Sequence, residues 1–299
     1  MKLRDVLLGV FTALVWGLNF VVIKLGLTAF PPLLFSALRF LVAAIPAVFF
    51  VGRRDIPWGV ILQVGLVLGV IKYSLLYLGV KVGMPAGLSS LAIQAQVPFT
   101  LLLSSVLLHD TPSRPQKCGI AVALGGVALL ASTRQGDVDP LGFALVVAAA
   151  FAWAVANILM KRAGGADPFR LMVWMSLVPP LPLFVLSYLF EDGQVAAVSH
   201  MDAAGLGAVL YTGLVATVLA FGIWGRLLRR YSANLVAPIG LLVPVFGMAF
   251  SALLLGERTS AVGILAAVMI LLGLFIVVVG PRIERSLARP AIHPTRGRT

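Results

Sequence analysis

Charged side chains are scarce in this chain. Of its 299 residues, 11% are charged and 60% are hydrophobic, and the mean hydropathy is +1.04. About a quarter of the residues of a water-soluble domain are charged, because its surface must be solvated. The composition therefore excludes a soluble globular protein and predicts an all-α membrane protein.

Residues that support redox, metal or acid–base chemistry are also few. The one cysteine, Cys118, permits no internal disulfide and no multi-cysteine metal site. The three histidines, His109, His200 and His293, lie outside the apolar runs. The sequence has no His-Glu-x-x-His, no Gly-x-Ser-x-Gly and no glycine-rich phosphate loop. We therefore expect no catalytic residue, no cofactor and no metal site, and a membrane enzyme is the alternative from a different functional class.

The net charge of +12 raises the question of nucleic-acid binding. Here the positive residues stand in short segments between apolar runs, so they do not form one basic face. We expect a small-molecule substrate and membrane lipid as partners, and no nucleic acid. The first apolar run is too long for the core of a signal peptide, about 7–15 residues, and is expected to be retained. Monomer and homodimer both stay open.

Apolar runs of about 20 residues, the length that crosses the hydrocarbon, fill most of the chain. They predict ten spanning helices near residues 6–25, 33–51, 58–80, 84–107, 116–132, 140–160, 169–189, 203–225, 232–255 and 260–281. The segments on one side of these helices hold 17 Lys and Arg, and those on the other side hold Lys24, Lys81, Arg134 and Arg258. Because cytoplasmic loops retain positive charge, both termini are expected in the cytoplasm of a bacterium, with the helices in its inner membrane.

The two halves of the chain match each other at a nearly constant offset of 137 to 148 residues. The matched pairs are Trp16 and Trp153, Lys24 and Lys161, Gly65 and Gly213, Pro98 and Pro244, and Asp110 and Glu257. Five spans is an odd number, so the second copy enters the membrane upside down, as in many transporters. We predict two inverted five-helix repeats, 1–134 and 135–281, around a central cavity, and a disordered basic cytoplasmic tail at 282–299.

Prolines interrupt two predicted spans at matched positions. Pro98 removes a backbone hydrogen bond in the fourth span and crowds the carbonyl of Gln94, and Pro244 acts in the same way in the ninth. Further weak points in these two helices are Pro85, Pro238 and Gly240. Carbonyls freed at membrane depth need protein or a water-filled cavity around them. The two helices are therefore predicted to line the transport path and to act in gating, and bending for packing alone is the alternative.

Two tryptophan–asparagine pairs occupy the first helix of each predicted repeat. Trp16 lies three residues before Asn19, and Trp153 lies four before Asn157, so each pair shares a helix face. A Trp platform beside an amide can hold an apolar side chain and a zwitterionic backbone. The alternative is an interhelical hydrogen bond beside a packed Trp.

The fourth span carries two glutamines on different faces. Gln94 lies one turn after Ser90, whereas Gln96 is about 200° away around the helix. Only one of them can face a cavity, and we select Gln94 because the Ser90 face also carries the carbonyl freed by Pro98.

The third span contains a lysine too deep to reach the membrane surface. Lys72 stands next to Tyr73, with Tyr77 one turn further, and is expected to bind a carboxylate or to face water. Propping helices apart is the alternative. Arg39 in the second span is interpreted as structural. The predicted substrate-binding residues are Trp16, Asn19, Lys72, Tyr73, Tyr77, Ser90, Gln94, Trp153, Asn157, Tyr211 and Trp224.

No Asp or Glu falls inside a predicted span. A proton antiporter normally uses a buried carboxylate whose pKa cycles near neutral. The sequence therefore predicts facilitated export without an obligatory proton. A channel is one alternative, although paired interrupted helices favour alternating access.

Several segments resemble a known family: VWGLNF at 15–20, LRF at 38–40, GMPAGL at 83–88, residues 231–244 and LGER at 255–258. Over about residues 4–280 the chain resembles the EamA family of the drug/metabolite transporter superfamily, above all its exporters of O-acetylserine/cysteine and of aromatic amino acids. The resemblance implies ten helices, a cavity lined by the first, third, fourth, sixth, eighth and ninth, and efflux of amino acids or related metabolites. It also implies structural roles for Arg39 and Glu257. Broad drug efflux is the alternative, although the chain lacks the buried Glu of four-helix drug exporters.

Overall fold

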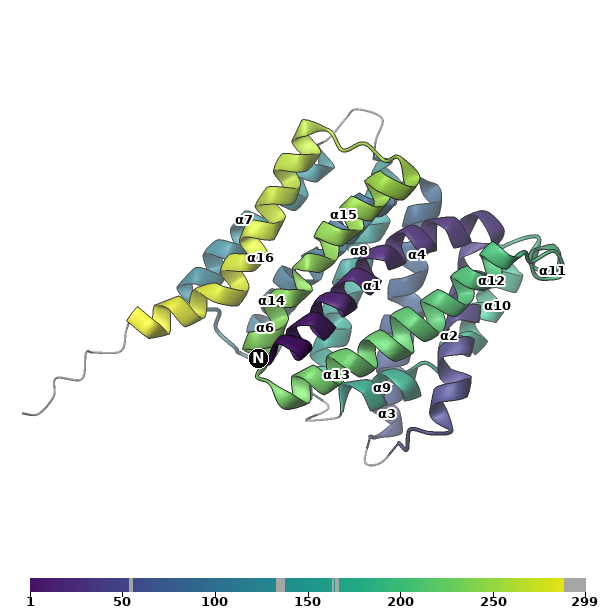
Figure 1. Cartoon of the computed structure of the whole chain (residues 1–299), viewed down its shortest axis with the longest axis horizontal. Helices are drawn as coiled ribbons and strands as arrows, with labels where there is room; N and C mark the ends of the chain where they lie inside the picture. Colours follow the sequence, from purple (N-terminus) through teal and green to yellow (C-terminus); the bar gives the residue numbers. More distant parts are fainter. Residues whose placement is uncertain (54–55, 133–137, 163, 165–166, 288–299) are drawn as a thin grey trace, which may run out of the picture.

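The computed structural model describes residues 1–53, 56–132, 138–162, 164 and 167–287, without the side chains of 233–234 and 285–287. These residues form helices and no strand (Figure 1). The helices of the first half are α1 (Leu3–Ala29), α2 (Pro32–Val48), α3 (Trp58–Val64), η1 (Gly65–Lys72), α4 (Tyr73–Val82), α5 (Ala86–Ala92), η2 (Ile93–Ala95), α6 (Gln96–Leu107) and α7 (Arg114–Ala131). The chain is therefore all-helical, as its composition predicts.

The second half repeats the pattern with more breaks. Its helices are α8 (Pro140–Arg162), α9 (Pro168–Met175), α10 (Pro180–Phe190), α11 (Gln194–Ser199), α12 (Ala203–Leu210), η3 (Tyr211–Leu219), α13 (Ala220–Arg230), α14 (Ala233–Gly240), α15 (Leu242–Leu255) and α16 (Ala261–Leu287). In the described residues, seven continuous helical stretches are long and apolar enough to cross a membrane, or eight if α9 and α10 count as one span. The protein is therefore a multi-pass membrane protein.

Three of the ten expected ranges, 33–51, 116–132 and 169–189, hold helices that fall outside these seven. Helix α2 is apolar but has 17 residues, and α7 has 18 residues with Arg114 and Lys117 in its first turn. The range expected at 169–189 contains a bend of 42° between α9 and α10. The bend coincides with Pro179 and Pro180, which cannot donate the backbone hydrogen bonds of a continuous helix.

The last helix corrects the expected start of the tail. Helix α16 continues through Pro281 to Leu287, so residues 282–287 are helical instead of belonging to a disordered tail. Residues 288–299 lie outside the described residues. In Figure 1, α16 lies beside α7 at one edge of the molecule.

The third expected span of each half contains a π-helical segment, and the two segments lie at matched positions. These segments are η1 in the stretch Trp58–Val82 and η3 in the stretch Ala203–Arg230. Each packs closely against the second helix of the other half. A Cβ on Gly65 would lie 3.0 Å from the carbonyl oxygen of Met175, and one on Gly213 would lie 2.8 Å from that of Arg39. Wide turns of this kind occur frequently at functional sites.

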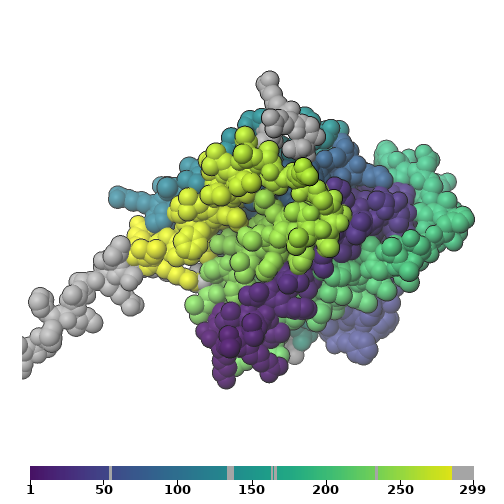
Figure 2. All heavy atoms as spheres, turned by 45° about the horizontal axis from the view of Figure 1, so that its top comes forward, coloured from purple at the N-terminus to yellow at the C-terminus, as the bar shows by residue number. Residues whose placement is uncertain are grey.

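The first helix of the chain, α1, packs against helices of the second half. Helix α1 lies beside α15 (Figure 1). Helix α15 in turn packs against α5. Figure 2 shows the same neighbourhood from above, with the C-terminal helices in yellow-green beside α1 in purple. Added Cβ atoms would lie 2.5 Å from the Cβ of Phe246 at Gly17 and 2.3 Å from the Oγ of Ser90 at Gly247. Helix α15 therefore leaves no room for larger residues on either side.

An acidic side chain of the second half caps the start of a helix in the first half. Glu191, which follows α10, accepts the backbone N–H groups of Leu33 (2.7 Å) and Leu34 (3.1 Å) at the start of α2. The first N–H groups of a helix have no partner within it, so an outside acceptor stabilises the helix. The contact also ties the end of the bent α9–α10 stretch to the first half.

Replacing Gly247 with Ala is expected to destabilise the protein, because the new methyl group overlaps Ser90. Overpacking of this kind costs about 1–3 kcal/mol. Thermal unfolding of the detergent-purified protein measures the loss. Gly207→Ala is the matched control, since a Cβ there meets no atom within 4 Å, and its Tm should not fall. Equal Tm values for the two variants would show that α15 and α5 are less tightly packed than described.

Candidate functional site

Two positively charged side chains lie buried beside one tyrosine in the interior of the helical bundle. Arg39 of α2 is 2% exposed and Lys72, at the end of η1, is 3% exposed. The Cζ of Arg39 lies 4.2 Å from the ring centroid of Tyr73, and the Nζ of Lys72 lies 3.4 Å from it. Among the described residues, neither cation forms a salt bridge with a carboxylate.

Arg39 joins the two halves through neutral oxygens. Its Nη1 donates to the hydroxyl of Tyr77 (3.0 Å), and its Nη2 donates to Oγ1 of Thr217 (2.7 Å). Thr217 belongs to η3, where its own hydroxyl donates to the carbonyl of Thr212 five residues earlier (2.8 Å). The Nε of Arg39 is buried without a hydrogen-bond partner in the described structure.

Lys72 lies against aromatic faces and pairs with no carboxylate of the described residues. Besides Tyr73, its Nζ lies 4.5 Å from the ring centroid of Trp153 on α8. A cation over an aromatic ring is attracted by the ring's quadrupole, by about 2 kcal/mol when desolvated. This partner of Lys72 could not be inferred from the sequence, because Trp153 lies 81 positions further along the chain.

A second aromatic group holds α1 against η3 and α13. The Nε1 of Trp16 donates to the carbonyl of Ala216 (2.9 Å), and the hydroxyl of Tyr211 donates to the carbonyl of Val15 (2.8 Å). The ring of Trp16 lies 5.3 Å from that of Trp224. The structure thus brings three of the predicted residues, Trp16, Tyr211 and Trp224, into one cluster.

The two predicted asparagines differ in their surroundings. The Oδ1 of Asn19 is buried and has no hydrogen-bond partner in the described structure. Asn157 donates from Nδ2 to Oε1 of Gln96 (2.8 Å) and to Oγ1 of Thr100 (3.0 Å). The amide of α8 therefore bonds to the interrupted fourth span.

The glutamine in this contact is Gln96, which the sequence argument set aside in favour of Gln94. Gln94 lies in the 3₁₀ turn η2 and forms no side-chain hydrogen bond with the described residues. Ser90 is fully buried, and its hydroxyl donates to the carbonyl of Gly87 (2.6 Å). The 3₁₀ turn between Ser90 and Gln96 departs from the regular helix that a helical wheel assumes.

The matched prolines stand at matched breaks. Pro98 is the third residue of α6 and follows the turn η2, and Pro244 is the third residue of α15 and follows the break at Leu241. Pro238 lies inside α14, and Gly240 is its last residue. Pro85 precedes the first residue of α5, so it marks the start of a helix and not an interruption within one.

At one end of the molecule, Glu257 gathers four partners. It forms a salt bridge with Lys24 near the end of α1 (2.5 Å), accepts the N–H groups of Ala86 (2.9 Å) and Gly87 (3.1 Å), and accepts the hydroxyl of Ser251. Burial opposes ionisation, but these donors outweigh it and lower the pKa of Glu257 below its usual value. The carboxylate therefore remains charged in neutral solution.

At the opposite end, Asp110 forms the equivalent cluster. It pairs with Lys161 near the end of α8 and accepts the hydroxyl of Ser104 (2.7 Å). Hydrogen bonds from Lys161 and then from Ser104 lower the pKa of Asp110 below its usual value. Its side chain is 54% exposed, whereas that of Glu257 is 14% exposed.

The residues of the two clusters correspond one to one. Ser104 and Asp110 stand 147 positions before Ser251 and Glu257, and Lys24 stands 137 before Lys161. In each cluster the lysine comes from the first helix of one half and the carboxylate follows the fourth helix of the other. The offset between the two halves of the sequence matched the lysines and the carboxylates. It did not indicate the serines, nor that each lysine pairs with the carboxylate of the other half.

Comparison with known proteins identifies the family. The model of the EamA-like transporter family matches this chain twice, at residues 3–132 and 140–279. The chain belongs to the EamA-like transporter family. It is therefore a membrane transporter and not an enzyme.

Two similar proteins have full-length matches to this EamA-like transporter. One, from Salmonella typhimurium, is named "Probable amino-acid metabolite efflux pump" and is 42% identical, over 96% of this chain and 98% of its own length. A protein of the same name from Escherichia coli is 40% identical, over 96% and 99%. One solved crystal structure aligns with 97% of this chain and 100% of its own at a TM-score of 0.67 and 21% identity, which is evidence of a shared fold.

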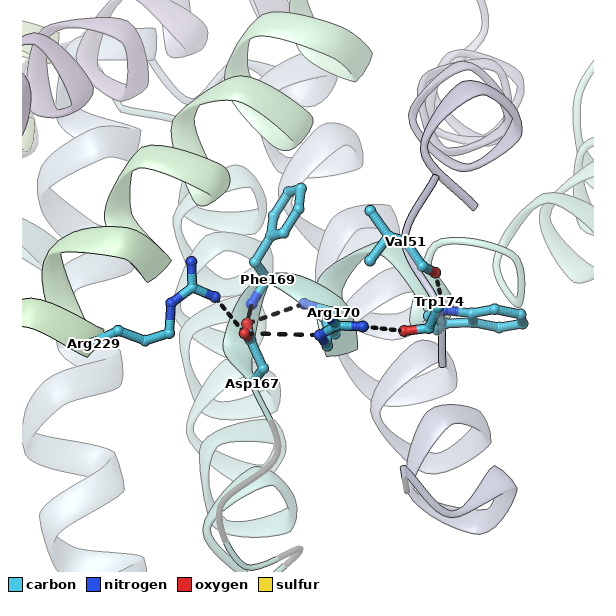
Figure 3. Close-up of polar contacts among 7 residues, drawn as sticks. Val51, Asp167, Phe169, Arg170, Trp174 and Arg229 are labelled. Carbon is cyan, nitrogen blue, oxygen red and sulfur yellow. Dashed lines mark hydrogen bonds and ion pairs between the residues drawn. The ribbon is translucent and has the colours of Figure 1, made fainter. Parts of the chain in front are cut away.

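A third polar cluster of this EamA-like transporter centres on Asp167 (Figure 3). Asp167 accepts the N–H groups of Phe169 (2.9 Å) and Arg170 (3.3 Å) at the start of α9 and pairs with Arg229 at the end of α13. Burial opposes its ionisation, but the N–H of Arg170 and the side chain of Arg229 lower its pKa below the usual 3.8. The Asp-Pro sequence, typical of a helix start, is the signal that could have predicted this cap.

Arg170 and Trp174 extend the Asp167 cluster to the segment that follows α2. The Nη1 of Arg170 donates to the carbonyl of Gly52 (2.6 Å), and the Nε1 of Trp174 donates to that of Val51 (2.8 Å) (Figure 3). The cluster therefore fixes α9 between α13 and the segment after α2.

Asp167→Ala is expected to lower the stability of the transporter by about 1 kcal/mol through loss of the helix cap, and Asp167→Asn by less, because Asn still accepts backbone N–H groups. Since the pKa of Asp167 is lower in the folded protein, its charge stabilises the fold at pH values above the pKa of the unfolded state. This stabilisation is lost as the pH falls through the pKa of the folded state. The Tm difference between wild type and Asp167→Asn should therefore narrow as the pH falls below the usual carboxylate pKa.

Asp192→Asn is the control for Asp167, since this carboxylate forms no salt bridge in the described residues. A change within about 0.5 kcal/mol is expected for it. If the Asn and Ala variants of Asp167 lost equal stability at neutral pH, the carboxylate would act only through its charge and the cap would be excluded.

Proposed function

We propose that this EamA-like transporter exports amino acids or related small metabolites across the bacterial inner membrane by alternating access. The names of the relatives from Salmonella typhimurium and Escherichia coli support the substrate class and the direction. The observation that carries the mechanism is the pair of crossed ion-pair clusters, Lys24–Glu257 and Lys161–Asp110, at opposite ends of the molecule.

The proposed topology has ten spans, with α2 and α7 added to the seven stretches and the bent α9–α10 pair. Helix α2 is apolar apart from the buried Ser36 and Arg39, and the positive start of α7 suits a cytoplasmic membrane surface. The two family matches support two repeats, here taken as 1–134 and 135–281. In the proposal each repeat has five spans, so the second is inverted, and the distribution of Lys and Arg favours both termini in the cytoplasm. In this orientation the arginines at the end of α13 lie at the cytoplasmic end, where anionic lipid attracts positive charge.

Inverted repeats give a transporter two equivalent ends that open in turn. In this proposal the Glu257 cluster closes the periplasmic end, because it links α1 to α15 and also holds the start of α5. The Asp110 cluster links only α8 to the segment after α6 and is largely exposed. The two crossed clusters therefore differ in burial, and at the cytoplasmic end the Asp167 cluster adds contacts between α9, α13 and the segment after α2.

The proposed export needs no proton. Asp110 and Glu257 both have lowered pKa values, so neither cycles its charge near neutral pH. The interior cations Arg39 and Lys72 pair with no carboxylate in the described residues. A carboxylate that gains and loses a proton inside the membrane, the usual element of a proton antiporter, is therefore not part of this mechanism.

Counterflow of a radiolabelled amino acid in liposomes tests the proton-independent mechanism. The rate should depend on the amino acid gradient and should stay the same when an imposed pH gradient is collapsed, because no carboxylate on the path exchanges a proton. Asp110→Asn should leave this pH insensitivity unchanged. A steep dependence on the imposed pH gradient would contradict facilitated export.

Charge-swap variants test the two clusters. Lys161→Glu should slow counterflow a few-fold, in line with an exposed ion pair worth up to about 1 kcal/mol, and adding Asp110→Lys should restore the rate. Lys24→Glu should also slow it, but adding Glu257→Lys should not restore the rate, because a lysine cannot accept the N–H groups of Ala86 and Gly87.

Lys117→Glu serves as the control for the charge swaps, since it changes an exposed lysine that has no salt bridge in the described residues. The cluster assignment fails if the single reversals leave counterflow unchanged. It also fails if both swapped pairs recover to the same extent, because the Glu257 cluster would then have no role beyond the ion pair.

A further inference from the structure

The proposed transport mechanism leaves one feature of the interior without a function: two buried positive charges with no negative partner. Arg39 and Lys72 are almost fully covered and face the same ring, that of Tyr73. Transfer of an unpaired charge from water into a protein interior costs several kcal/mol. Sequences retain such groups inside a membrane mainly where they bind something.

The carboxylates of the described residues are committed elsewhere or lie at the ends of the helices. Those in salt bridges or helix caps are Asp5, Asp110, Asp139, Asp167, Glu191, Asp202 and Glu257. Asp192 follows α10, and Glu284 lies in the last turns of α16. The protein therefore supplies no acidic side chain to the two cations from its described part.

The neutral partners leave donors for an outside anion. The two terminal nitrogens of Arg39 are taken by Tyr77 and Thr217, which leaves the Nε–H buried and unpartnered. Lys72 lies over the rings of Tyr73 and Trp153, and a ring face is a much weaker acceptor than a carboxylate oxygen. Both cations thus have capacity for a negatively charged ligand.

We propose that Arg39 and Lys72 form an anion subsite that takes the carboxylate of the transported molecule. This inference rests on the proposed export of amino acids or related metabolites. Tyr73 lies between the two cations, and Trp153 and Thr217 add contacts from the second half. The ammonium group of an α-amino acid, repelled by the cations, points away from them toward neutral side chains.

The subsite lies where the two halves must move relative to one another. Lys72 ends η1, and Thr217 lies in η3, the two matched π-helical segments. Both cations are covered in the described arrangement, so a carboxylate reaches them only after the packing around η1 and η3 loosens. Each half contributes to the subsite, and binding of one anion between them therefore affects the relative position of both.

Counterflow with three related compounds tests the subsite: an amino acid, its primary amide and the amine left when its carboxyl group is removed. Purified wild-type protein in liposomes should prefer the acid over both analogues by about tenfold or more, the usual effect of a charge-assisted hydrogen bond. Lys72→Gln should raise KM for the acid and leave the rate for the amide unchanged, so that the preference disappears. Lys72→Arg should retain it.

Two further variants separate the subsite from structural effects. Tyr73→Phe keeps the ring between the cations and should keep the preference, which excludes an ionised tyrosine as the anion. Arg39→Gln should behave as Lys72→Gln does; if it fails to fold, Lys72→Gln and Tyr73→Phe decide the result. Lys117→Gln, an exposed lysine of α7, should match wild type.

The outcomes distinguish the subsite from the proposed function. If wild type carries the acid and the amide equally well, or if Lys72→Gln slows both to the same extent, the subsite is wrong and amino acid export stands. If the preference for the acid disappears when chloride is removed, the cations hold an inorganic anion and the subsite is also wrong. If wild type carries none of the amino acids, the proposed function and the subsite fall together.

Discussion

The hydrocarbon interior of a membrane offers no hydrogen-bond partner, so polar groups inside this protein depend on partners from the chain itself or from a ligand. Arg39 illustrates the consequence, because its terminal nitrogens reach Tyr77 in one half and Thr217 in the other. Trp16 and Tyr211 bond to carbonyls across the same boundary. The contacts that satisfy buried polar groups are therefore also the contacts that join the two halves.

The same constraint explains where negative charge lies. Asp110, Asp167 and Glu257 occupy helix ends, where lysine or arginine side chains are within reach, and Asp167 and Glu257 also accept backbone N–H groups. The interior keeps positive charge beside aromatic rings instead. This separation of charge makes the ends suitable for holding helices together and leaves the interior suited to a negatively charged ligand.

Several features of the fold follow from the sequence because they depend on neighbouring residues only. Runs without charge gave the helical stretches, and Pro98 and Pro244 marked breaks that the structure places at matched points of α6 and α15. The offset between Lys24 and Lys161 and that between Asp110 and Glu257 indicated equivalent positions. Such signals need no knowledge of which helices meet.

The partners of these residues were decided by tertiary structure alone. The hydrogen bond between Gln96 and Asn157, for example, joins residues 61 positions apart on α6 and α8. Lys72 meets Trp153 because η1 packs against α8. A sequence determines which residues share a face of one helix, whereas the helix that lies opposite depends on packing between distant segments, which local composition does not encode.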